Sequence, residues 1–244
     1  MNKKLKFIFK NKKKYKIVLY LLLFTVFFFS TYFLIPKFFN YTPKVIQESL
    51  KKNSNINIKH ISNINYKFFP SPRLILSGVD LEFGEDILNV ENSEVDIVLN
   101  PLGIMNYRIL DYNKFFIRGG LTNLEVNKIN KFFYYIKKNR NKINFKNNTI
   151  IFFSQNKKLF KINDSSVKFS SKNNSQQLVI NGLFLNHKAS FVLKDKNDKI
   201  INISLKVPQL DISTNILIEN IDNFKTFKGI INFEILNNFF QFNL

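Results

Sequence analysis

The chain has 244 residues, 45% of them hydrophobic, which is enough for one sizeable domain together with a membrane anchor. It contains no cysteine, which excludes disulfides and cysteine-ligated metals. Lys and Arg number 37 against 17 Asp and Glu, a net charge of +20, but the lysines are scattered and no nucleic-acid-binding motif accompanies them, so we expect a solvated basic surface and no nucleic-acid partner.

The N-terminal segment has the composition of a membrane anchor. Residues 1–16 contain eight lysines and no acidic residue, and residues 17–35, IVLYLLLFTVFFFSTYFLI, carry no charge. A membrane helix needs about 20 apolar residues, whereas a cleaved signal peptide has a shorter apolar core and a small-residue cleavage site. No such site follows residue 35, so we expect an uncleaved transmembrane anchor over residues 17–35. The positive-inside rule then places the basic tail, residues 1–16, in the cytoplasm and the remainder across the membrane.

A short helix and a long series of strands are predicted after the anchor. Thr42 suits an N-cap and Pro43 suits the first helical position, so residues 36–55 form a juxtamembrane helical segment. Over residues 56–244, apolar and polar residues mostly alternate with the two-residue period of a sheet, except for a helical pattern at Asn127–Lys138. The predicted fold class is mainly β with an N-terminal transmembrane helix: a curled antiparallel meander, or half-open β-groove, with one or two short inserted helices.

The clearest apolar face lies on two predicted strands, residues 73–83 and 87–99. The apolar positions assigned to this face are Ile75, Val79, Leu81, Val95, Ile97 and Leu99. The apolar face of an open sheet must be covered, and two short helices offer little cover. These residues are therefore either a sealed core or the lining of an apolar groove, and the sequence leaves both alternatives open.

A proline-rich corner precedes the first of these strands, in the segment KFFPSPR, residues 67–73. Pro70 and Pro72 cannot donate a backbone hydrogen bond, and each restricts the residue before it to extended conformations. Together with Arg73 they are predicted to form a stiff structural corner that turns one strand into the next, without a direct role in binding.

The stretch from Thr42 to Leu124 resembles the AsmA-like family of Gram-negative inner-membrane proteins. After the anchor come, in the family's order, TPKVIQESLKKNSNINIKH, ISNINYKFFPSPRLILSGVDLEF, ILNVENSEVDIVLNPLGIMNYRI and DYNKFFIRGGLTNLEV. The later segments INFKNNTIIFF and LVINGLFLNHKASFVL resemble the family's hairpins more weakly. Members of the family are commonly much longer than this chain.

This resemblance implies a single-pass inner-membrane protein whose periplasmic β-domain, residues 56–244, holds phospholipid acyl chains in an apolar groove. The implied function is phospholipid transport toward the outer membrane and assembly of that membrane. The implied partners are the inner membrane, phospholipid acyl chains and other envelope proteins, and no cofactor is implied. The alternative is a membrane-anchored envelope scaffold or assembly factor with a sealed β core and no lipid ligand.

No recognisable catalytic or metal-binding pattern occurs in the sequence. His60 and His187 are the two histidines and are far apart in the chain, and there is no G-x-S-x-G elbow, P-loop or dinucleotide fingerprint. We therefore expect no enzymatic activity, no catalytic residue and no metal site.

Overall fold

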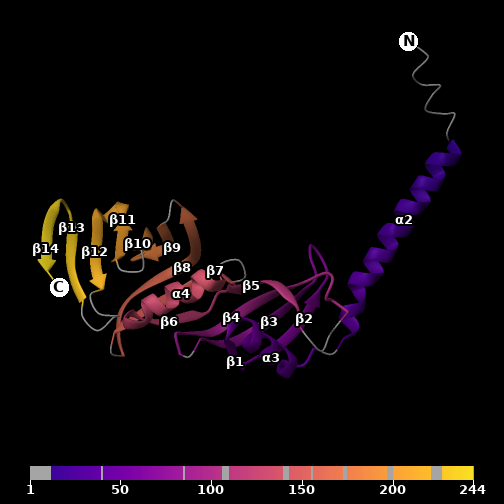
Figure 1. The fold of residues 1–244 in the computed structure, drawn as a ribbon, viewed down its shortest axis with the longest axis horizontal. Coiled ribbons are helices and arrows are strands. Elements are labelled where there is room, and N and C mark those ends of the chain that lie inside the picture. The colour runs from indigo at the N-terminus through magenta and orange to yellow at the C-terminus, as the bar shows by residue number, and fades with distance from the viewer. Residues whose placement is uncertain are drawn as a thin grey trace, which may run out of the picture.

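The computed structural model describes residues 12–39, 41–84, 86–105, 110–139, 143–154, 156–172, 175–196, 200–220 and 227–243. Most of these residues belong to one long sheet that starts near an N-terminal helix and continues to the opposite end of the molecule (Figure 1). The helices are α2 (Lys12–Leu34), η1 (Ile35–Phe38), α3 (Pro43–Ser54), η2 (Val126–Lys128), α4 (Ile129–Asn139) and η3 (Pro208–Leu210). The strands are β1 (Ile56–His60), β2 (Asn63–Lys67), β3 (Arg73–Phe83), β4 (Leu88–Leu99), β5 (Tyr112–Arg118), β6 (Leu121–Glu125), β7 (Ile143–Ser154), β8 (Lys157–Lys172), β9 (Ser175–Phe184), β10 (His187–Lys196), β11 (Ile200–Val207), β12 (Ile212–Asn220), β13 (Phe227–Ile235) and β14 (Asn238–Asn243).

Helix α2 projects away from the rest of the molecule (Figure 1). Its side chains from Tyr15 to Thr31 are all exposed. Among the described residues, the helical stretch Tyr15–Phe38 is the one that is long and apolar enough to cross a membrane, as an anchor or as a signal sequence. The 23 residues of α2 give it a length of about 34 Å at 1.5 Å per residue, which matches a hydrocarbon core of about 30 Å.

The sheet is largely antiparallel and has 14 strands, in agreement with the predicted mainly β fold. The strands follow the order β1-β3-β4-β5-β7-β8-β9-β10-β11-β12-β13-β14, while β2 pairs with β3, and β6 pairs with β4 and β7. The sheet departs from antiparallel pairing at one place, where β5 and β6 both run parallel to β7. A parallel pair needs a long crossover connection, and the segment that contains η2 and α4 provides it.

The core is built from the apolar face of the first ten strands and from the two helices that lie over it. The Phe132 ring of α4 lies 6.2 Å from the Phe145 ring of β7, measured between centroids. The Tyr135 ring of α4 lies 5.7 Å from the Phe83 ring of β3. Ile46 of α3 is completely buried in the same cluster of side chains. The two inserted helices therefore cover the half of the sheet that lies nearer to α2.

Polar interruptions in the sequence predict short strands at residues 142–145 and 149–154 and at residues 158–162 and 166–170, but each pair forms one long strand, β7 and β8 respectively. Asn147 in β7 and Asp164 in β8 adopt left-handed backbone conformations with φ of 54° and 46°. The register between β7 and β8 shifts near these residues, and both strands continue beyond them. Asn and Asp tolerate the left-handed region, so here they form bulges that bend the strands instead of ending them.

We predict that Tyr135→Phe destabilises the domain by about 1–3 kcal/mol, because it leaves a buried carbonyl without its donor. The buried Tyr135 hydroxyl donates a hydrogen bond of 2.5 Å to the carbonyl of Ser54, the last residue of α3. Burial raises the pKa of the Tyr135 hydroxyl, which therefore stays protonated at neutral pH. Urea unfolding of the full chain in detergent measures the loss, and Tyr20→Phe on exposed α2 is the control that should leave the midpoint unchanged.

Candidate functional site

The structure places most of the predicted lining residues in a sealed core. Val79, Leu81, Val95, Ile97 and Leu99 are each at most 2% exposed. They belong to one continuous cluster of buried side chains, to which α3 and α4 contribute. Of the two alternatives left open by the sequence, the sealed core describes this half of the sheet.

Ile75 does not share the face to which the sequence pattern assigned it. Gly78 has a φ of +58°, and the register between β3 and β4 shifts between Leu76 and Val79. This β-bulge exchanges the two faces of β3, so the buried residues before it are those of the opposite parity. Ile75 therefore lies on the outer face, opposite Asp96 of β4.

The outer face of β4 holds a buried carboxylate between two arginines. Asp96 is buried, and its Oδ2 accepts hydrogen bonds from the guanidinium groups of Arg73 and Arg118. Arg73 also donates to the hydroxyl of Ser71 at 2.9 Å. Pairing of Oδ2 with two partly exposed arginines offsets much of the cost of burying this charge, although Oδ1 accepts no hydrogen bond from the described residues. The arrangement is a structural clamp across three strands.

The Pro70–Arg73 corner joins β2 to β3 at the end of the sheet that adjoins α2, where the sequence predicts a turn between strands. Lys67 pairs with Arg73 across it, and the Pro72 carbonyl accepts a 2.9 Å hydrogen bond from the Leu99 amide. The Phe69–Pro70 peptide bond is cis. The corner is thus fastened to β4 by its backbone and by the Arg73–Asp96 contact.

An open apolar face occurs farther along the sheet, on β11 to β14. Cross-strand pairing aligns apolar side chains there in two rows that begin on β8. The first apolar row is Phe169, Leu178, Leu193, Ile203, Ile216, Ile231 and Phe242, and the second apolar row is Val167, Ile180, Phe191, Leu205, Thr214, Phe233 and Phe240.

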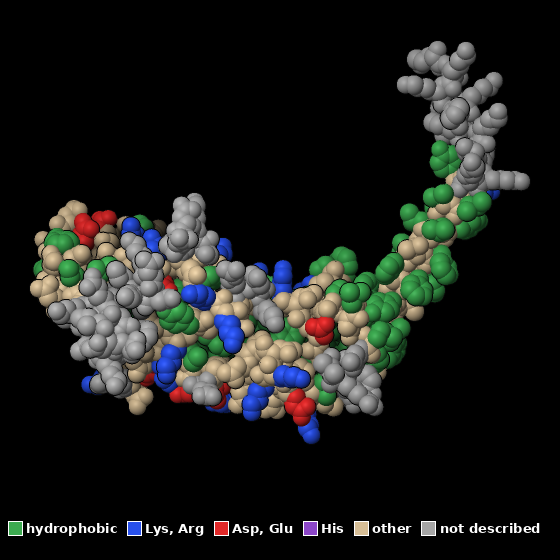
Figure 2. Space-filling model, viewed as in Figure 1, with side chains coloured by type: hydrophobic (Ala, Val, Ile, Leu, Met, Phe, Trp, Pro, Cys, Tyr) green, Lys and Arg blue, Asp and Glu red, His purple; other side chains and the backbone are tan. Residues whose placement is uncertain are grey.

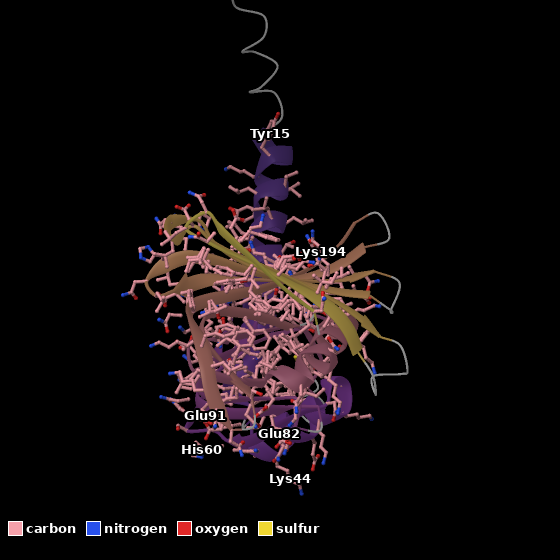
Figure 3. All side chains as sticks on the ribbon, turned by 90° about the vertical axis from the view of Figure 1, so that its left-hand side faces the viewer. Tyr15, Lys44, His60, Glu82, Glu91 and Lys194 are labelled. Atoms are coloured by element: carbon pink, nitrogen blue, oxygen red, sulfur yellow. The ribbon has the colours of Figure 1, made fainter. Side chains whose placement is uncertain are left out.

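Both apolar rows are most buried on β9 and β10 and become more exposed toward β14. Leu178 and Leu193 are at most 1% exposed, Ile203 is only partly buried, and Phe242 at the last strand is 56% exposed. Figure 3 looks along the molecule from the β14 end and shows the strands curving around an interior crowded with side chains. The apolar surface of the sealed core therefore continues without interruption to solvent at the far end of the sheet.

The opposite face of the same strands is mostly polar, although the exposed Ile230 and Phe239 also lie on it. Ser204, Asn215, Asn232 and Gln241 lie opposite one another on β11 to β14. A sheet with one polar and one uncovered apolar face is amphipathic, and its apolar face favours contact with an apolar ligand or surface. The alternation of apolar and polar residues in residues 200–218 is the sequence signal for this face.

A polar hollow of about 320 Å³ lies near the start of β4, lined in part by Asp86, Asn89, Asn123, Glu125 and Lys128. A hydrogen bond from Lys128, together with its positive charge, lowers the pKa of the Asp86 carboxyl. No cluster of three His, Cys, Asp or Glu residues able to hold a metal ion occurs in the described part of the chain. The Asp86–Lys128 ion pair is largely exposed and is a surface contact.

No protein-family model, curated protein or solved structure matches this chain. The open apolar face and the helix α2, long enough to cross a membrane, are consequently the two features from which a function can be proposed.

Proposed function

We propose that this protein is a membrane-anchored, AsmA-like lipid-handling protein whose open apolar face holds phospholipid acyl chains. In this proposal α2 crosses the bacterial inner membrane, the basic tail is cytoplasmic, and the β-domain stands in the periplasm and takes part in moving phospholipid toward the outer membrane. The observation that carries it is the pair of apolar rows, which lead from the sealed core to the exposed Phe240 and Phe242.

The chemistry of such binding is passive. Each methylene group of an acyl chain that leaves water for the apolar rows contributes about 0.8 kcal/mol. Thr214 is the one polar residue in the two rows, so a chain lying along them meets almost no group that would need a hydrogen bond. The head group stays in solvent beyond the edges of the strands, and no covalent step is required.

We predict that a phospholipid with a photoactivatable acyl chain labels residues of β11 to β14 when the full chain is reconstituted in vesicles. Labelling of α2 in the same sample reports the surrounding bilayer and serves as an internal standard. Ile216→Asp places a charge in the first apolar row and is expected to abolish labelling of β11–β14 while labelling of α2 remains. Mass spectrometry of the labelled peptides measures the extent of labelling of β11–β14 and of α2.

Asn215→Asp is the matched control, because it adds a carboxylate at the neighbouring position on the polar face. This variant should be labelled like the unmodified protein. Absence of labels on β11–β14 in the unmodified protein, with α2 labelled, would contradict lipid binding by the open face.

The second candidate is the anchored envelope scaffold without a lipid ligand. The sealed core formed by Val79, Val95 and Ile97 favours it, because that half of the sheet has no room for an acyl chain. A scaffold would cover its open apolar face with another protein. Labels on α2 but none on β11–β14 are the result expected for this second candidate.

A further inference from the structure

Four exposed hydrophobic side chains surround the point at which α2 meets the sheet. Phe38 is 84% exposed, Phe68 47%, Phe69 77% and Leu102 91%. They come from η1, from the corner before β3 and from the turn after β4, and we call them the apolar tip. Figure 2 shows hydrophobic side chains continuing from α2 onto the end of the sheet that it joins. Such a cluster, remote from the core, marks a contact surface.

The corner lies beside α2 and not beyond its end. A cleft of about 470 Å³ separates them, with Thr25, Phe29 and Phe33 of α2 on one side and Phe68 and Phe69 on the other. Thr25 lies nine residues before the last residue of α2, which is about 14 Å along the helix. That depth is close to half of a hydrocarbon core of about 30 Å.

Two tyrosines hold the corner and the neighbouring turn in this position. The Tyr66 hydroxyl donates a 2.6 Å hydrogen bond to the Phe33 carbonyl, and the Tyr32 hydroxyl donates a 3.0 Å hydrogen bond to the Pro101 carbonyl. Burial raises the pKa of Tyr66 to about 12, so its hydroxyl remains a donor throughout the neutral range. The apolar tip consequently keeps a fixed depth relative to α2.

The chemistry of the corner suits a lipid environment. Pro70 and Pro72 have no N–H group, so this turn offers fewer unpaired donors to hydrocarbon, where each unsatisfied group costs several kcal/mol. Lys37 and Lys67 are exposed beside the same aromatic residues. Lysines next to an inserted apolar segment extend toward the head groups and attract anionic lipid.

We propose that the apolar tip inserts into the leaflet on the domain side of the membrane, and that an acyl chain of a bilayer phospholipid fills the cleft between α2 and Phe69. This proposal rests on the proposed function in one respect, namely that α2 spans the bilayer. It does not depend on lipid binding by the open apolar face of β11–β14.

The chain contains no tryptophan, which allows a direct test with single-tryptophan variants. Full-length Phe69→Trp is reconstituted in vesicles of phosphatidylethanolamine and phosphatidylglycerol, with or without a phospholipid carrying brominated acyl chains. We expect brominated lipid to quench the tryptophan emission of Phe69→Trp as strongly as it quenches that of Phe24→Trp, a second variant with its tryptophan at an exposed position within α2. Aqueous iodide should quench the emission of Phe69→Trp only slightly. Phe239→Trp, at an exposed position on β14, should show the reverse pattern.

The two controls separate the ways in which the proposal can fail. If brominated lipid quenches Phe24→Trp but iodide quenches Phe69→Trp, then α2 lies in the bilayer and the apolar tip does not. This result would overturn the inserted tip and leave the anchor intact. Absence of lipid quenching in Phe24→Trp would overturn the anchor and the tip together. Phe68→Trp provides a second position on the apolar tip. It is expected to show the same quenching by brominated lipid, and it replaces Phe69→Trp in the test if that variant fails to fold.

Discussion

Replacement of Ile97 by aspartate is expected to unfold the domain, whereas the same replacement at Ile216 is expected to leave it folded. Ile97 is completely buried and pairs with Leu74 and Phe115 on the neighbouring strands. An unpaired carboxylate there costs several kcal/mol, a large part of the roughly 5–15 kcal/mol by which domains are stable. Ile216 lies on the open face, where a carboxylate can reach water.

Circular dichroism and resistance to trypsin of the two full-length variants measure this difference. The comparison matters because both residues occupy apolar positions that alternate with polar ones along a strand, and only their cover differs. A folded Ile97→Asp protein would show that the half of the sheet nearer to α2 can open, and would make Val79, Val95 and Ile97 candidate groove residues again.

A second large loss of stability is expected on substitution of Gly120, in the turn between β5 and β6. Its φ is +80°, and a Cβ added there would lie 2.6 Å from the Glu91 carbonyl oxygen. Gly120→Ala therefore combines a left-handed alanine with overpacking against backbone, and we expect it to cost about 2–5 kcal/mol. Thermal or urea unfolding measures the effect.

Gly119 supplies the matched control. It also has a positive φ, +62°, but nothing lies within 4 Å of an added Cβ. Gly119→Ala should therefore lower the free energy of unfolding only by the cost of a left-handed alanine, about 1–2 kcal/mol. Equal losses in the two variants would show that the backbone conformation alone, and not the approach of β4, makes glycine necessary at residue 120.

Much of the secondary structure can be predicted from local patterns. The predicted strand at residues 73–83 coincides with β3, and residues 200–207, whose alternation also predicts a strand, form β11. The helix expected at Asn127–Lys138 is present as η2 followed by α4. Local alternation and helical spacing act over a few residues, and here tertiary contacts agree with them.

Which apolar residues are sealed could not be predicted, because burial depends on what lies over the sheet. Val95 and Ile231 occur in similar alternating patterns, yet α3 and α4 lie over the half that contains Val95, whereas Ile231 belongs to the open half. The bulge at Gly78 exchanges the faces of β3, and a strict two-residue period cannot detect such an exchange. The order of strands around β7 was likewise missed, because it depends on the crossover through α4.

The last strand of the described sheet, β14, pairs with β13 on one side, and its other side is uncovered. Each strand from β8 onward contacts chiefly its immediate neighbours, so this part of the domain is built like a repeat protein, whose units stack in one dimension. Adding one more hairpin would lengthen both apolar rows by about 10 Å, at about 4.8 Å per strand. Such an addition would leave every earlier contact unchanged, so this architecture can differ in length between proteins without differing in design.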